Sequence, residues 1–146
     1  MTPICICCEK EMLVLGTSLA ARLLSGDVLL LYGELGAGKT VLTRGIARGM
    51  NISEPILSPT FTLFHRYEGE PPLHHFDLYR LCGGQSFDEA GLSEHIGGDA
   101  VSIIEWPERC INALPAKHLK IYIQYGEEES RTVTIVPHGG FREIPL

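Results

Sequence analysis

The sequence predicts an α/β domain in which helices flank a central, mostly parallel sheet, with antiparallel strands toward the C-terminus. Three observations predict this class. An unbroken apolar segment at 28–32 is typical of a strand covered on both faces. The segments before and after it carry apolar residues at helical spacing. Two segments near the C-terminus instead alternate with a period of two, which is typical of antiparallel strands.

The size and charge of the chain indicate how many domains it has, where it works and what it binds. The chain has 146 residues, 45% of them hydrophobic, and a formal net charge of −6. We expect one domain over 1–146, since a chain of this length can bury a core without disulfides or metal. No apolar run has the length of a membrane span, and no secretion signal begins the sequence, so we expect a cytoplasmic protein. The acidic balance disfavours direct binding to a phosphate backbone, so we expect any nucleic acid to be met through a partner.

The first elements follow from local patterns. Alternation at 4–7 predicts a half-buried strand in which cysteine thiols pack as small apolar groups. The five cysteines are odd in number and bunched, which indicates free thiols. Apolar residues at helical spacing predict a helix over 9–24 that ends at Ser25-Gly26-Asp27, and a second helix is predicted over 39–50.

The remaining elements are shorter. Strand-like segments at 60–67 and 73–79 flank a turn and predict a hairpin. We expect short helical pieces over 87–96, a second buried strand at 100–104 and a short helix from 107 to 114. Segments 119–125 and 131–136 flank an acidic turn and predict an antiparallel pair.

A phosphate-binding motif lies between the buried strand and the second helix. Gly33-Glu34-Leu35-Gly36-Ala37-Gly38-Lys39-Thr40 matches G-x-x-x-x-G-K-[ST] in full. Glycines let consecutive backbone N–H groups turn toward a polyphosphate, and the following helix directs its positive end there. Lys39 is expected to reach the β and γ phosphates, and Thr40 to place its hydroxyl on Mg²⁺. The motif predicts a P-loop NTPase-like fold with a magnesium–nucleotide site.

Two acidic residues stand at the ends of predicted strands. Glu105 follows the second buried strand, where open α/β sheets gather their ligands, and we expect it in the metal shell. Asp77 follows the strand-like segment at 73–76 and is expected to hold Mg²⁺-bound water or orient the nucleophile, with Arg80 anchoring it. Which of the two acids orients the attacking water stays open.

Other P-loop classes fit less well. Leu81-Cys82-Gly83-Gly84-Gln85-Ser86 looks like the signature of ABC transporter ATPases, but it lies too close to the loop for that class. No N-K-x-D segment is present to read guanine. A small nucleotide or small-molecule kinase is the alternative; it would need a lid and arginines that clamp two sets of phosphates.

Four segments together resemble one family. They are Gly36-Ala37-Gly38-Lys39-Thr40 followed by Thr43-Arg44-Gly45, Ser58-Pro59-Thr60-Phe61, His75-Phe76-Asp77-Leu78-Tyr79-Arg80, and Glu105-Trp106-Pro107. The sequence resembles the TsaE (YjeE) family, the ATPase factor needed to make threonylcarbamoyladenosine in tRNAs that read codons beginning with A. The resemblance implies Mg²⁺ and ATP as cofactors, slow ATP hydrolysis, and assembly with TsaD and TsaB, through which tRNA is contacted.

The resemblance also implies roles for individual residues. Thr40 and Glu105 would hold Mg²⁺, and Asp77 and Glu105 would act in hydrolysis. Ser58-Pro59-Thr60 resembles a switch-like loop that senses the γ phosphate. Trp106 is expected either to shape the nucleotide pocket or partner surface, or to pack in the core. Met12 departs from the hydroxyl residue that members often have near the nucleotide. The residues expected to bind the nucleotide are Leu35, Gly36, Ala37, Gly38, Lys39, Thr40, Val41 and, from the C-terminal strands, Arg131.

Overall fold

The computed structural model describes residues 3–57, 63–79 and 91–146. Over these residues the chain forms one seven-stranded sheet, two α-helices and two 3₁₀ segments. In chain order they are β1 (Ile4–Ile6), α1 (Glu9–Ala20), β2 (Val28–Tyr32), α2 (Lys39–Gly49), β3 (Phe64–Tyr67), β4 (Leu73–Asp77), η1 (Ser93–His95), β5 (Val101–Glu105), η2 (Pro107–Ala113), β6 (His118–Tyr125) and β7 (Arg131–His138).

The sheet has the strand order β1-β7-β6-β2-β5-β4-β3. Its four central strands, β6, β2, β5 and β4, are parallel, and antiparallel pairing is confined to the β6–β7 and β3–β4 hairpins and to β1 on β7. β2 and β5 are almost wholly buried, as their apolar sequences predict. The predicted α/β class, with a parallel centre and antiparallel C-terminal strands, is confirmed.

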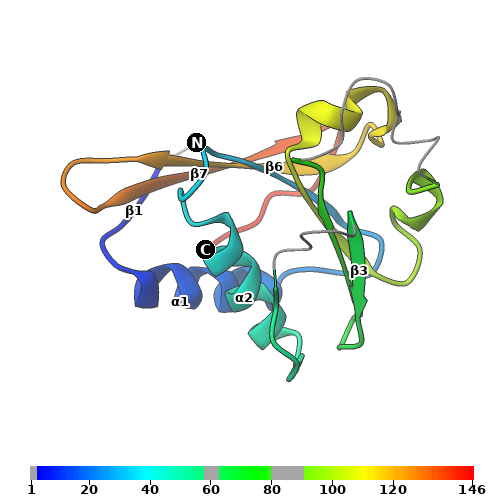
Figure 1. Cartoon of the computed structure of the whole chain (residues 1–146), viewed down its shortest axis with the longest axis horizontal. Helices are drawn as coiled ribbons and strands as arrows, with labels where there is room; N and C mark the ends of the chain where they lie inside the picture. Colours follow the sequence, from blue (N-terminus) through cyan, green and yellow to red (C-terminus); the bar gives the residue numbers. More distant parts are fainter. Residues whose placement is uncertain (1–2, 58–62, 80–90) are drawn as a thin grey trace.

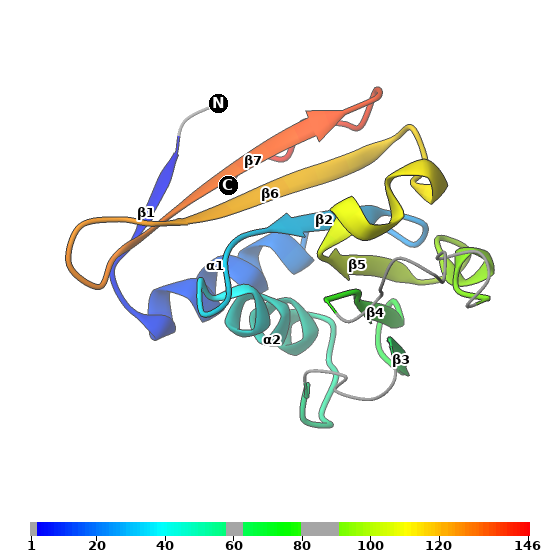
Figure 2. The same cartoon turned by 45° about the horizontal axis from the view of Figure 1, so that its top comes forward.

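The two α-helices lie side by side on one face of the sheet (Figures 1 and 2). They cover a large core that includes Leu29 and Leu31 of β2 and Ile103 of β5. The helices approach closely because glycines face each other. A Cβ at Gly16 would lie 2.7 Å from Ile46 N, and one at Gly45 would lie 2.5 Å from Leu13 O.

The opposite face of the sheet carries a smaller core. Leu30, Phe76 and Ile104 pack there with Leu92 and with Cys110 of η2. The second helical layer predicted by the sequence is, over the described residues, made of 3₁₀ segments, which are η1 within 87–96 and η2 within 107–114. Cys110 of η2 has non-helical backbone angles, so this segment contains a kink.

The first helix ends earlier than its apolar spacing predicts, at Ala20 instead of residue 24. The following turn is held by Asp27, whose Oδ2 accepts a hydrogen bond from Leu24 N at 2.8 Å. Arg142 donates to both carboxylate oxygens of Asp27, at 3.0 and 2.7 Å. Leu23 stays buried outside the helix. The helical spacing of apolar residues therefore extends past the end of the helix into a turn. This turn is held by Arg142, which lies near the C-terminus.

The first strand corrects the expectation for its cysteines. Ile6 is buried, whereas Cys5 and Cys7 are exposed, as is Cys8. The isoleucines take the inward positions of the alternation, so the thiols do not pack in the core. Over the described residues, no helix is both long and apolar enough to cross a membrane.

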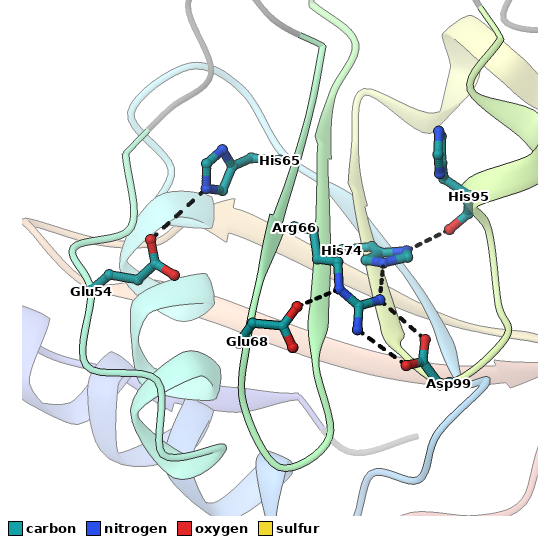
Figure 3. Close-up of polar contacts among 7 residues, drawn as sticks. All are labelled: Glu54, His65, Arg66, Glu68, His74, His95 and Asp99. Atoms are coloured by element: carbon teal, nitrogen blue, oxygen red, sulfur yellow. Dashed lines mark hydrogen bonds and ion pairs between the residues drawn. The ribbon is translucent and has the colours of Figure 1, made fainter.

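A polar cluster ties the β3–β4 hairpin to the segment before β5 (Figure 3). Arg66 of β3 donates two hydrogen bonds of 3.1 Å to Asp99 and one of 2.7 Å to Glu68. Its guanidinium also lies 2.9 Å from His74 Nε2, which must accept because arginine only donates. His74 Nδ1 in turn lies 2.6 Å from the carbonyl oxygen of His95. His74 is therefore part of the polar cluster that holds the β3–β4 hairpin at the edge of the sheet.

Candidate functional site

The phosphate motif forms the loop between β2 and α2. Gly36 and Gly38 have φ values of 81° and 116°, in the left-handed region that favours glycine. Gly33 also needs to be glycine, because a Cβ there would lie 2.9 Å from Ile123 O. Lys39 and Thr40 then begin α2, so the positive end of the helix faces the loop. The glycines therefore occur where the backbone requires them.

Lys39 is buried at the centre of the site, with 5% of its surface exposed. Its Nζ donates a 2.6 Å hydrogen bond to Gly33 O and lies 4.0 Å from the ring centroid of Trp106. Burial lowers the pKa of Lys39, while the carboxylates of Glu105 and Asp77 act in the opposite direction. The two acids predicted from strand ends therefore lie within electrostatic reach of the loop's lysine.

Glu105 and Asp77 are the last residues of adjacent parallel strands. Glu105 is paired in register with Leu31 of β2 and with Asp77 of β4. Side chains alternate along a strand, so Glu105 lies on the same face as Ile103, which packs under the helices. Glu105 is only 3% exposed, and an Asp77 carboxylate oxygen accepts the backbone N–H of Tyr79 at 3.2 Å. The structure thus brings the predicted acids together on the helix-covered face.

His75 is a site residue to which sequence reasoning assigned no role. Its Nε2 lies 2.5 Å from Oε2 of Glu105, and both side chains are buried. Because a carboxylate accepts, Nε2 carries the proton in this pair. Neighbouring side chains of a strand point to opposite faces, and His74 accordingly faces Arg66. The signal that identifies His75 is its spacing of two residues from Asp77, which puts both on one face of β4.

Trp106 follows Glu105 in a left-handed conformation, with φ of 59°. Its ring covers Lys39 Nζ and lies 5.0 Å from the ring of Tyr79. The indole also packs against the smaller core cluster. Trp106 therefore packs in the core, as one of its two interpretations expects, and it also covers the lysine of the loop.

The β6–β7 hairpin supports the loop from outside. The two strands continue beyond the end of β2, alongside the loop (Figure 2). Tyr125 donates its hydroxyl to Leu35 O at 2.8 Å, and Arg131 Nε donates to Ala37 O at 3.1 Å. Arg131 Nη2 lies 3.5 Å from Gly36 O, and the guanidinium stacks on Tyr125 at 4.4 Å. The residues predicted to bind phosphates through their backbone thus have their carbonyl groups held by this hairpin.

Two open pockets flank the loop. One, of about 430 Å³, lies where the loop enters α2 and is lined by Gly36, Ala37, Gly38, Val41, Arg131, Met12 and the Cys7–Cys8 segment. Met12 there fills the space beside Gly38, since a Cβ on Gly38 would meet its Cε at 3.1 Å. The other, of about 550 Å³, is lined by Gly33 and by four aromatic rings. The predicted switch at Ser58-Pro59-Thr60, the anchoring Arg80 and the segment 81–86 lie outside the described residues.

The chain is similar to known proteins over most of its length. The family described as threonylcarbamoyl adenosine biosynthesis protein TsaE matches residues 7–133. A tRNA threonylcarbamoyladenosine biosynthesis protein TsaE from Nostoc is 41% identical over 144 residues, covering 94% of this chain and 86% of the relative. The protein of the same name from Treponema pallidum is 39% identical over 120 residues, covering 82% and 89%.

A solved structure agrees with these relatives. The crystal structure of YdiB from Bacillus subtilis matches with a TM-score of 0.78 and 31% sequence identity, covering 95% of this chain and 86% of that one. These matches favour a protein of the tRNA threonylcarbamoyladenosine pathway over the small kinase that the sequence left as an alternative. The chain belongs to the TsaE family.

Proposed function

We propose that this protein binds Mg²⁺ and ATP at the loop, hydrolyses ATP slowly by itself, and works in the cytoplasm with TsaD and TsaB homologues in forming threonylcarbamoyladenosine on tRNA. The observation that carries the proposal is the meeting of Lys39, Glu105 and Asp77 beside a P-loop in a TsaE-family chain. Because the chain has a net charge of −6, we assign the contact with tRNA to its partners.

The residues present fit a magnesium–triphosphate. Mg²⁺ in nucleotide sites usually takes one or two protein oxygens and completes its shell with phosphates and water. Thr40 in the first turn of α2 and Glu105 at the end of the strand beside β2 supply such a pair. Among the described residues, no cluster of three His, Cys, Asp or Glu could hold a metal alone, which agrees with a metal bound mainly through the nucleotide. When bound, Mg²⁺ would neutralise charge on the phosphates.

The chain's own residues would then have separate roles in binding the nucleotide and in its hydrolysis. Lys39 binds the outer phosphates, and the backbone N–H groups of 35–41 bind the rest. His75 donates to Oε2 of Glu105 and so fixes this carboxylate, leaving its other oxygen for the metal. Asp77, at the neighbouring strand end, orients the attacking water and accepts its proton. The Tyr125–Arg131 pair keeps the loop in shape from outside.

The test is a reconstitution with purified TsaD and TsaB homologues and unmodified tRNA. ATP turnover is measured for the chain alone and with partners, and the modified nucleoside is measured by mass spectrometry of digested tRNA. We expect partner-dependent stimulation and loss of turnover in Asp77→Asn and Glu105→Gln. The matched control is Glu143→Gln, which changes an exposed carboxylate. Glu143 follows Arg142, the residue that binds Asp27 before β2. Modified tRNA formed equally well without the chain would refute the proposal.

A further inference from the structure

The aromatic pocket beside the loop is separate from the residues that hold phosphates. It has a volume of about 550 Å³, and Gly33 is one of its lining residues. Its walls include Tyr32, Tyr122, Trp106 and Tyr125, and its carboxylates are Glu34 and Glu108. Tyr32 and Tyr122 are stacked, with ring centroids 4.9 Å apart. Glu34 and Glu108 are exposed, so both carboxylates lie at the surface and not in the core.

The position of this pocket relative to a bound nucleotide follows from Lys39. The P-loop lysine pairs with the β and γ phosphates, and Lys39 Nζ lies 2.6 Å from the carbonyl oxygen of Gly33, a residue that lines the pocket. The other pocket instead reaches Val41, where the loop has already become helix. The aromatic pocket therefore lies toward the outer end of the triphosphate.

The chemistry of the walls suits a cation. Aromatic faces attract ammonium and guanidinium groups, and nearby carboxylates add a charge partner. Two rings that line this pocket already contact cations of the chain, Trp106 with Lys39 and Tyr125 with Arg131. The carboxylate of Glu108 also acts on the Tyr32 hydroxyl, whose pKa is raised first by burial and then by Tyr122 and Glu108. A phosphate backbone of RNA would be repelled by the same carboxylates.

We propose that this pocket receives an arginine side chain from a partner protein, with its guanidinium stacked on the tyrosines and paired with Glu108. This inference rests on the proposed function, because it supposes a nucleotide on the loop and a protein partner. Arginine fits better than lysine because its planar guanidinium stacks on rings and can bind a carboxylate through two donors. A partner cation at the outer end of the triphosphate stabilises the charge of phosphoryl transfer. It would also make hydrolysis depend on the partner.

The first experiment tests the pocket without any partner. Trp106 is the chain's single tryptophan and lines the pocket, so its fluorescence reports occupancy. The probes are the blocked tripeptide Gly-Arg-Gly and the same peptide with uncharged citrulline. We expect saturable binding that is about tenfold weaker with citrulline. Glu108→Gln should weaken binding of the arginine peptide, whereas Glu143→Gln should not. Equal binding of both peptides, or no saturable change, would overturn the inference.

A single-stranded oligonucleotide is the third probe in the same measurement. Weaker binding of the oligonucleotide than of the arginine peptide is the expected result. Tighter binding that persists in Glu108→Gln would overturn the inference and assign the pocket to RNA.

The second experiment uses the reconstituted complex. Glu108→Arg should lower partner stimulation, measured as the ratio of stimulated to basal turnover, by about tenfold, since it puts a like charge where the arginine enters. Tyr122→Leu, with folding checked by thermal unfolding, should lose stimulation to a smaller extent. Full stimulation of Glu108→Arg would overturn the arginine pocket while the proposed function stands. If the wild type is not stimulated, the proposed function fails, and the peptide titration still decides what the pocket binds.

Discussion

Lys39 is held on several sides before a nucleotide arrives. Gly33 O accepts its hydrogen bond, Trp106 covers it, and Glu105 and Asp77 lie close enough to oppose the effect of burial on its pKa. A buried lysine whose side chain is already held in place is ready to bind an anion, because little side-chain freedom has to be lost on binding. The site is therefore organised around one cation.

Replacing this cation should remove nucleotide binding. Lys39→Ala deletes the charge that we propose faces the outer phosphates, so we expect ATP affinity to fall by about 100-fold or more, as charge-assisted contacts in buried sites are strong. Isothermal titration with Mg-ATP measures this. The control is Lys117→Ala, an exposed lysine, which should bind normally. Unchanged ATP affinity in Lys39→Ala would contradict the assignment of the loop.

His75 offers a second test at the scale of one residue. His75→Ala removes the donor to the buried Glu105 carboxylate, and we expect turnover to fall by about tenfold or more, as for other partners of metal-binding side chains. His75→Gln, which retains a donor, should restore part of the rate. Turnover is measured against Mg²⁺ concentration. If His75 were only structural, thermal stability would fall without a shift in the Mg²⁺ dependence.

At the scale of elements, the two helices and the C-terminal hairpin position the loop from opposite sides. α1 and α2 meet backbone to backbone through Gly16 and Gly45, which fixes where α2 begins. The hairpin holds the carbonyl groups of the loop through Tyr125 and Arg131. The loop therefore depends on contacts with both halves of the chain.

The helix contact can be tested with Gly45→Ala. The added methyl group would meet the backbone of Leu13 at 2.5 Å, so the helices must separate, and we expect a loss of about 1–3 kcal/mol in the free energy of unfolding. Urea denaturation followed by circular dichroism measures it. Val14→Ala, at a position of α1 that is 58% exposed, should change stability by no more than about 0.5 kcal/mol. Equal effects of the two changes would mean that the close contact does not matter.

The hairpin contact can be tested with Tyr125→Phe. This change keeps the ring and removes only the hydroxyl that binds Leu35 O, a contribution of about 0.5–1.5 kcal/mol. We expect Mg-ATP affinity to weaken by about two- to tenfold, since the loop loses part of its support. Titration with ATP gives the affinity, and Tyr67→Phe, in the β3–β4 hairpin, is the matched control. Wild-type affinity in Tyr125→Phe would show that the loop holds its shape alone.

The sequence predicts the elements and most of the candidate site, for identifiable reasons. The glycine pattern identifies Lys39 and Thr40, and strand ends identify Glu105 and Asp77, because parallel strands present their carboxyl ends at one edge. The support from Tyr125 and Arg131 was not predictable locally, because it requires knowing that β6 pairs with β2. The early end of α1 was missed for the same reason, since Asp27 is held by the distant Arg142.

At the scale of the whole molecule, nucleotide binding should stabilise the fold. The loop, α2, β4, β5 and the hairpin all contribute to one site, so a ligand there opposes unfolding of the entire sheet. At a hundredfold excess over its dissociation constant, a ligand adds about 2.7 kcal/mol, which corresponds to a rise in Tm of about 5–11 °C for a chain of this size. Differential scanning fluorimetry with Mg-ATP measures it.

Removing the metal gives the matching control. Addition of EDTA at constant ATP should abolish most of the rise in Tm, because the triphosphate then lacks the Mg²⁺ that we propose Thr40 and Glu105 hold. An equal rise with and without EDTA would contradict a magnesium-dependent site.

The strand order also has a consequence for how the protein is made. β2 and the phosphate loop are synthesised early, but both neighbours of β2 in the sheet, β5 and β6, begin only at Val101 and His118. A nascent chain emerging from the ribosome therefore carries an apolar strand without a sheet partner until most of its length has been translated. Both β5 and β6 must be synthesised before the strand that precedes the phosphate loop is paired on its two sides.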